Sequence, residues 1–323
     1  MGQLGSEPAN LSLSDTGQYL YVALYGENAI QQLTLPNFAV NTAWNLGGVG
    51  SFSGSYYALD LQAEPGAPQT TAVTLANFDV SPSSVAVVIY DGSTPRPNQL
   101  QALLYPYSAL QWASTAPTLY AVDQQGPEDF LVLGVGPSGA TLIQHFDGVV
   151  SPYSTGIHYD AGTGLVYTDG GQAIQPSSGA VVGTYVSSGI AVPDSTLNRV
   201  FILGQTAVQA GTSNYTVESF DQTQFTAIGS ITIENLVGTP TALIRWGTSG
   251  LAFTTRVGGP ADFLNTGPGQ LYVISGDFVK PSIDAVKFLG TTPMLPVKRT
   301  WNLGTSSKHT SRMAGVNPNP MTQ

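Results

Sequence analysis

Short runs of alternating apolar and polar residues, separated by turn residues, begin near the N-terminus. Tyr19–Leu24 alternates with the two-residue period of a β-strand, and Asp15-Thr16-Gly17 and Gly26-Glu27-Asn28 on either side of it are turn signals. Similar runs cover Asn10–Ser14, Ala29–Leu35 and the alternating set Val40, Thr42, Trp44 and Leu46. Four antiparallel strands within about forty residues are the unit of a β-propeller blade.

The unit recurs along the chain. Gly156–Thr168 repeats Leu11–Val22, so that Ile157 aligns with Leu11. First strands are expected to begin near residues 10, 58, 108, 156, 190 and 241, a spacing typical of blade repeats. We therefore predict an all-β propeller over residues 1–280, with six recognisable four-stranded blades near residues 8–48, 56–105, 107–150, 154–187, 188–234 and 239–280.

The stretches LSLSDTGQYLYVALYGENAIQQLTLP, VAVVIYDGSTPRPN, DQTQFTAIGSITI and GTPTALIRWGTSGLAF resemble bacterial extracellular YVTN-type repeat propellers. That group is similar to the propeller of the quinoprotein amine dehydrogenase β-chain and often sits beside Ig-like modules. The resemblance covers residues 3–280 and implies a secreted, periplasmic or cell-surface parent protein. No signal peptide is recognised before the first blade. Fold alone does not assign a function.

Two departures from that family affect the expected architecture. The family usually has one more blade before Gly5–Pro8, so the chain resembles a seven-bladed parent that lacks its first blade. The tail, residues 281–323, is not the usual continuation, yet Thr291–Gly304 repeats Thr34–Gly47 in outline, with Trp301 in the place of Trp44. The tail is expected to supply a closing outer strand and then to be flexible. Otherwise the ring closes with six blades, or two chains pair through open blade edges.

Composition narrows the possible partners. The formal net charge is −10, which argues against nucleic acid, because phosphate binding needs a basic surface. No apolar run reaches the length of a membrane span, so membrane insertion is not expected. The chain has no cysteine, which excludes disulfides and thiolate chemistry. The remaining partners are a small molecule, another protein or a second copy of the chain.

Candidate chemistry lies at the face that carries the blade-to-blade connections and the loops between second and third strands. That face is expected to be acidic and rich in tyrosine, with Asp79, Asp123, Glu128, Asp129 and Asp262 in its loops. Solvated loops that keep an acidic protein soluble are the simpler interpretation. The more specific interpretation is a site for Ca²⁺ or another divalent cation, which takes oxygen ligands from several loops. Its expected ligands are Glu7, Asp60, Glu234 and Asn235.

Glu7 is the first choice among these ligands, since the following Pro8 is expected to hold it in an extended conformation. Asp60 and His158 belong to inner strands, where they could ligate a metal or activate water as catalytic groups. A hydrogen-bonded structural role is the alternative for His158, whose repeat position matches Ser12, Gln111 and Val192.

The sequence contains no Gly-x-Ser-x-Gly, Walker or His-Glu-x-x-His motif. Our first hypothesis is therefore a ligand- or partner-binding scaffold module without chemistry of its own. The alternative is a metal-dependent hydrolase of activated esters, lactones or phosphotriesters at the central channel, by analogy with other propellers.

Overall fold

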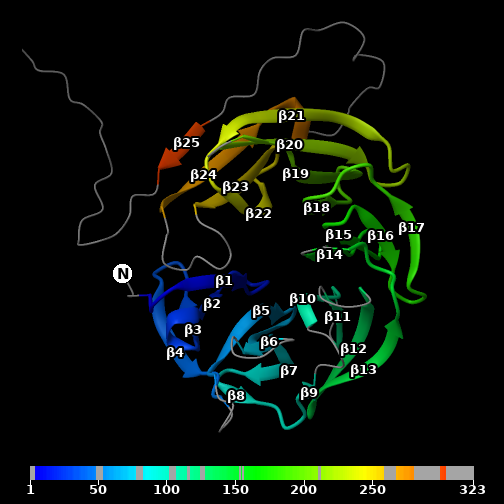
Figure 1. Ribbon diagram of the computed structural model, residues 1–323. Coiled ribbons are helices and arrows are strands. Elements are labelled where there is room, and N and C mark those ends of the chain that lie inside the picture. Colours follow the sequence, from blue (N-terminus) through cyan, green and yellow to red (C-terminus); the bar gives the residue numbers. More distant parts are fainter. Residues whose placement is uncertain are drawn as a thin grey trace, which may run out of the picture.

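The computed structural model describes residues 4–48, 54–77, 83–101, 107–114, 117–123, 128–152, 154, 156–209, 212–257, 267–279 and 299–302. Six antiparallel sheets stand around a common centre like the blades of a propeller (Figure 1). The predicted all-β propeller with six blades is therefore confirmed. The ring has six blades, and a missing first blade is not confirmed.

Each blade runs from an inner strand at the centre to an outer strand at the rim. Blade 1 contains β1 (Pro8–Leu13), β2 (Tyr19–Leu24), β3 (Ala29–Thr34) and β4 (Ala39–Asn45). Blade 2 contains β5 (Tyr56–Glu64), β6 (Ala67–Asn77), β7 (Ser84–Asp91), β8 (Thr94–Pro95) and β9 (Leu100–Gln101). Blade 3 contains β10 (Tyr107–Trp112), β11 (Thr118–Asp123), β12 (Phe130–Gly136) and β13 (Gly139–Phe146). Blade 4 contains β14 (Ile157–Asp160), β15 (Leu165–Thr168), β16 (Gln172–Gln175) and β17 (Ala180–Thr184). Blade 5 contains β18 (Ile190–Asp194), β19 (Arg199–Gln209), β20 (Thr212–Asp221) and β21 (Ala227–Leu236). Blade 6 contains β22 (Thr239–Trp246), β23 (Gly250–Val257), β24 (Gly267–Ser275) and β25 (Arg299–Asn302).

Two outer strands differ from the simple repeat. In blade 2 the outer position is divided between β8 and β9, which both pair with β7. In blade 6 the outer strand is β25, which pairs antiparallel with β24 and places Trp301 opposite Leu271. The tail therefore provides a fourth strand, as the repeat of Thr34–Gly47 predicts.

The described helices are two short 3-10 turns, η1 (Tyr25–Glu27) and η2 (Asp277–Val279), and no helix in this part of the chain could span a membrane.

Successive side chains on a strand point to opposite faces, so every blade has one face toward the preceding blade and one toward the following blade. Buried apolar side chains from both blades fill the junctions 1–2, 2–3, 3–4, 4–5 and 5–6. Tyr21, Tyr167 and Phe201 are fully buried there. Each such side chain contributes about 1.5–3 kcal/mol through burial, so the core is divided into slabs between blades.

Side-chain oxygens on the inner strands also bind the next blade. Ser12 Oγ accepts a hydrogen bond from the backbone N–H of Ala63 at 2.9 Å, and Asp194 Oδ2 accepts one from Arg245 Nε at 2.7 Å. Asp160 Oδ2 accepts bonds from Ser195 N at 2.9 Å and from Gln222 Nε2 at 2.8 Å. These bonds fix the relative position of neighbouring sheets, which apolar packing alone leaves adjustable.

Asp15 likewise accepts a bond from Gly66 N of blade 2 through its Oδ2. The Oδ1 atoms of Asp15, Asp160 and Asp194 accept bonds within their own turns, from Thr16 N, Gly162 N and Thr196 N. These aspartates therefore also stabilise the turns in which they lie. Asp91 differs, because its carboxylate pairs with Arg96 at 2.8 and 2.9 Å. Arg96 in turn donates to the carbonyl of Gly136 in blade 3.

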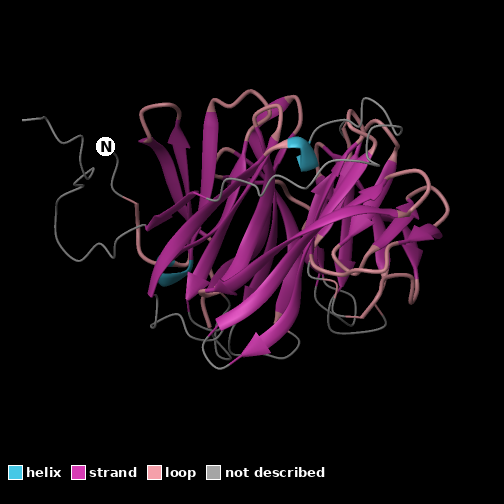
Figure 2. Cartoon of the chain, turned by 90° about the horizontal axis from the view of Figure 1, so that it is seen from above, coloured by secondary structure: helices cyan, strands magenta, loops and turns pink. Residues whose placement is uncertain are grey.

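The turns, loops and connections lie on the two faces of the ring (Figure 2). We call the face where the inner strands begin the entry face; it carries the blade-to-blade connections and the loops between second and third strands. The opposite face, where the inner strands end, is the exit face.

Replacing Asp160 by Asn is expected to lower the free energy of unfolding by about 1–3 kcal/mol, because an amide nitrogen cannot accept the bonds that the buried carboxylate accepts. Burial alone would raise the pKa of Asp160, but the bonds from Gln222, Ser195 and the turn amides together lower it below 3.8. The carboxylate therefore stabilises the fold above about pH 4, and this contribution is lost as the pH falls through the folded pKa.

Denaturant melts at several pH values measure this effect. Asp15→Asn is the matched control, since Asp15 makes the same two kinds of bond at an exposed position. A loss for Asp15→Asn as large as that for Asp160→Asn would contradict the role of burial.

Candidate functional site on the inner strands

The inner strands β1, β5, β10, β14, β18 and β22 line the centre of the ring (Figure 1). Ser12, Gln111, His158 and Val192 occupy equivalent places on four of them, paired with Tyr21, Tyr120, Tyr167 and Phe201 of the second strands. The predicted repeat alignment of His158 is therefore confirmed. The shared position faces the following blade.

Asp60 lies half-buried on the inner strand β5 and joins blade 2 to blade 3. Its Oδ1 accepts a bond from the backbone N–H of Leu61 at 2.8 Å, and its Oδ2 accepts one from Leu110 N at 2.7 Å. Burial raises the pKa of Asp60 from 3.8 to about 6, although both backbone bonds act in the opposite direction. Both oxygens already have donors, which favours a structural role. Its predicted catalytic and metal-binding roles remain predictions.

His158 lies on β14 and is held by a buried carboxylate. Its Nε2 is 2.9 Å from Asp169 Oδ1, and the same oxygen accepts the backbone N–H of Ala191 from blade 5 at 3.0 Å. The His158 side chain is 30% exposed, whereas that of Asp169 is 8% exposed. When protonated, His158 is near enough to Asp60 to lower its pKa. The pair of an oriented imidazole and a buried carboxylate is chemically usable, because it can hold a proton at Nε2.

Three of the predicted metal ligands lie elsewhere. Glu7 is exposed, immediately before β1, while Glu234 and Asn235 are exposed near the end of β21 in blade 5. Among the described His, Asp and Glu residues, the one group with three potential ligand atoms within 4.8 Å contains neither Glu7, Asp60 nor Glu234. The structure therefore does not bring these residues into one cluster, and their metal-binding roles stay predictions.

The expected extended conformation of Glu7 is wrong. Its φ is +54°, in the left-handed region, although Pro8 follows it. The Glu7 carbonyl accepts a hydrogen bond from Tyr25 N at 3.0 Å, which ties the start of β1 to the end of β2. This pairing outweighs the steric preference that proline imposes on the preceding residue.

Sequence reasoning missed the group Asp129, His145 and Asp147 on the entry face of blade 3. Asp129 is among the acidic loop residues that the sequence singles out, but His145 and Asp147 lie on and beyond β13, across a hairpin. Pairing of β12 with β13 brings them together. Of the other acidic loop residues, Asp79 and Asp262 lie outside the described residues.

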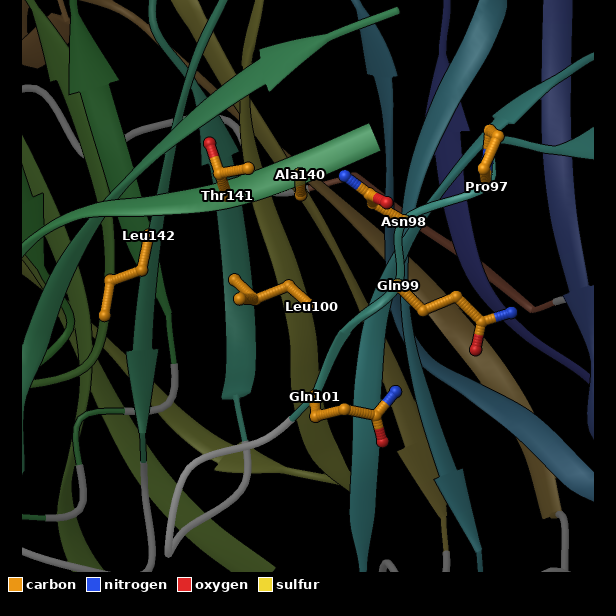
Figure 3. A pocket seen from close by; sticks show the side chains of 8 residues that line it. All are labelled: Pro97, Asn98, Gln99, Leu100, Gln101, Ala140, Thr141 and Leu142. Carbon is orange, nitrogen blue, oxygen red and sulfur yellow. The ribbon is translucent and has the colours of Figure 1, made fainter. Parts of the chain in front are cut away.

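A shallow pocket of about 600 Å³ lies on the rim between blades 2 and 3 (Figure 3). It is lined by Pro97, Asn98, Gln99, Leu100, Gln101, Ala140, Thr141 and Leu142. None of these side chains is titratable or a strong metal ligand. The pocket therefore lacks groups for acid–base or nucleophilic catalysis.

No protein-family model and no curated protein matches the chain. Among solved structures, a chain of the mitotic checkpoint complex matches with a TM-score of 0.61 and 13% identity, covering 93% of this chain and 78% of that one. The dihydro-heme d1 dehydrogenase NirN, in complex with DHE, matches with a TM-score of 0.51 and 13% identity, covering 85% of this chain and 55% of that one. The chain is similar to both in fold. At such low identity this likeness shows the β-propeller fold alone.

Asp60 gives a testable pH dependence. Because its folded pKa of about 6 lies above the ordinary value of 3.8, the folded state keeps a proton that the unfolded state releases. This group therefore makes the free energy of unfolding decrease as the pH rises from about 4 to 6. Asp60→Asn is expected to remove that component from the pH profile.

Ser12→Ala serves as the control, since it deletes an inter-blade acceptor that carries no charge. Chemical denaturation at half-unit pH steps measures all three proteins. If Asp60→Asn and the parent show the same slope, the Asp60 carboxyl titrates as it does in the unfolded chain.

Proposed function

We propose that this protein is a partner-binding scaffold module whose docking surface is an apolar notch between blades 1 and 6. We define the notch by Leu11 and Leu13 of β1 and by Ile244 and Trp246 of β22. Among the described inner strands, these are the large apolar side chains that remain exposed, by 60%, 56%, 53% and 58% respectively. This observation carries the proposal.

Leu11 and Leu13 occupy the face of β1 that looks toward the preceding blade. They pair with Val22 and Leu20, whereas Ser12 faces blade 2. The equivalent positions of later blades are filled by Leu110, Ile157 and Leu243, which are 5% exposed or less. On blade 6, Leu243 faces blade 5, so that Ile244 and Trp246 face blade 1.

The two end blades approach each other at the entry face. Burial raises the pKa of Tyr25, which directly follows β2 of blade 1, and the guanidinium of Arg256 in blade 6 is close enough to lower it. The notch residues lie further along β1 and β22, toward the exit face. Among the described residues, the buried apolar cluster on the face of blade 1 toward blade 6 contains only side chains of blade 1. The 1–6 junction therefore differs from the five others.

An extended apolar segment of a protein partner fits such a surface. Residues two apart on a strand are about 7 Å apart, which is also the spacing of alternate side chains in an extended peptide. Exposed apolar surface rimmed by polar residues is typical of protein-interaction sites. The partner is thus expected to present alternating apolar residues. The YVTN-type resemblance supports a secreted or surface parent protein.

The notch is tested with the fluorescent apolar probe 8-anilinonaphthalene-1-sulfonate and with arrays of extended peptides. Leu13→Thr combined with Trp246→Gln is expected to reduce binding of the probe and of peptides with alternating apolar residues, compared with shuffled sequences. Since both sites are exposed, the free energy of unfolding should change by no more than about 0.5 kcal/mol per substitution.

The control is Ile143→Thr combined with Val182→Thr, which removes exposed apolar side chains from outer strands. Equal loss of binding in this control would contradict a specific notch. Analytical ultracentrifugation of the parent adds a second outcome. A dimer that the notch variant dissociates would make a second copy of the chain the occupant.

A hydrolase is the second candidate, and the His158–Asp169 pair favours it, because a buried carboxylate orients a partly exposed imidazole on the inner strand β14. If the protein has this activity, the initial rate of hydrolysis of an activated ester, a lactone or a phosphotriester should saturate with substrate. It should require added Ca²⁺ and fall at least a hundredfold in His158→Ala, the usual scale for a general base. Rates equal to the buffer blank with and without Ca²⁺ would leave the binding module as the function.

A further inference from the structure

Three potential metal ligands meet at the entry face of blade 3. Asp129 immediately precedes β12, His145 is near the end of β13, and Asp147 follows that strand. The register pairs Leu131 with His145 and Phe130 with Phe146. His145 Nε2 lies 2.5 Å from Asp129 Oδ2 and 3.2 Å from Asp147 Oδ1, and all three ligand atoms lie within 4.8 Å of one another.

The group has a buried side and an open side. The Asp129 side chain is 6% exposed, and its second oxygen accepts the backbone N–H of Gly148 at 2.9 Å, which fixes the carboxylate. His145 is partly exposed, and Asp147 lies in solvent. An ion could therefore enter from water and meet a preoriented carboxylate and an imidazole.

Asp123 provides a second, independent observation. It ends β11 and is 5% exposed. Backbone N–H groups of Glu128 and Asp129 hydrogen-bond to its carboxyl group, but its Oδ1 is buried without a hydrogen-bond partner. Its backbone N–H donates to the carbonyl of Asp129, and the charge of Asp129 acts on its carboxyl group. A buried carboxylate oxygen without a donor is unfavourable unless something else satisfies it. A cation bound at Asp129 would supply positive charge beside it.

We propose that Asp129, His145 and Asp147 form a site for a divalent transition-metal ion of the Zn²⁺ type, with Asp123 as a supporting carboxylate behind Asp129. An imidazole nitrogen together with carboxylate oxygens suits Zn²⁺ better than Ca²⁺ or Mg²⁺, which prefer oxygen ligands alone. Three protein ligands leave a coordination position for water. Without a metal, His145 Nε2 and Asp129 Oδ2 are within hydrogen-bond distance of each other.

The site lies in the wall of one blade, away from the notch. It uses none of the residues predicted from the sequence as metal ligands. The proposed metal site therefore does not depend on the proposed partner binding.

The test is calorimetric titration of the full, tag-free chain, stripped with EDTA, with Zn²⁺ and separately with Ca²⁺. It is run at about pH 7.5, because protons compete with the metal for its ligands at lower pH. The parent is expected to bind one Zn²⁺ per chain and to melt at a higher temperature with it. His145→Gln and the exposed Asp147→Asn should each weaken Zn²⁺ binding at least tenfold, and Asp123→Asn about ten- to a hundredfold as a supporting group.

Asp15→Asn is the matched control, because it removes another exposed aspartate, on blade 1, and should leave Zn²⁺ binding unchanged. Since Asp147 is exposed, its substitution tests the site even if changes at Asp129 impair folding. The proposal is overturned if the parent binds no Zn²⁺, if it binds Ca²⁺ instead, or if Asp147→Asn and His145→Gln bind Zn²⁺ as the parent does.

Discussion

Every blade must cover two faces, and the structure depends on how neighbouring blades satisfy this constraint. Apolar slabs supply most of the burial, but they are non-directional and tolerate sliding. The hydrogen bonds that side-chain oxygens on one inner strand accept from N–H groups of the next blade are directional. Ser12, Asp60 and Asp194 each serve this role at a different junction. A polar residue near the axis of this ring is thus often a structural connection between sheets rather than a free ligand.

Much of the fold could be predicted from the sequence, because strand alternation and turn residues are local signals. The run Tyr19–Leu24 becomes β2 with the same bounds, and the outline shared by Thr34–Gly47 and the tail correctly suggests an outer strand, found at Arg299–Asn302. The conformation of Glu7 could not be predicted, since its bond with Tyr25 forms only when the sheet does.

The candidate metal site at Asp129 and His145 is harder to predict from the sequence, because it too forms only when the sheet does. His145 and Asp129 are brought together by strand pairing, and no fixed spacing motif marks such a pair. The notch is hidden as well, because Leu11 and Leu13 alternate with serine in the manner of a buried inner strand. Their exposure depends on the fit between two blades that are far apart in the chain. What the sequence does indicate is that Asp60 and His158 lie on inner strands, and their hydrogen bonds explain why those positions suit polar residues.

The difference between the 1–6 junction and the other five has a consequence for folding. Five well-packed junctions connect six sheets in chain order, so the molecule resembles a linear array in which each unit is supported by its neighbours. In such arrays stability is a sum of unit and nearest-neighbour terms, and the terminal units have the least support. Unfolding would then begin at blades 1 and 6 and proceed toward the middle blades of the array. The cooperativity of unfolding would depend on the length of the array rather than on closure of the ring.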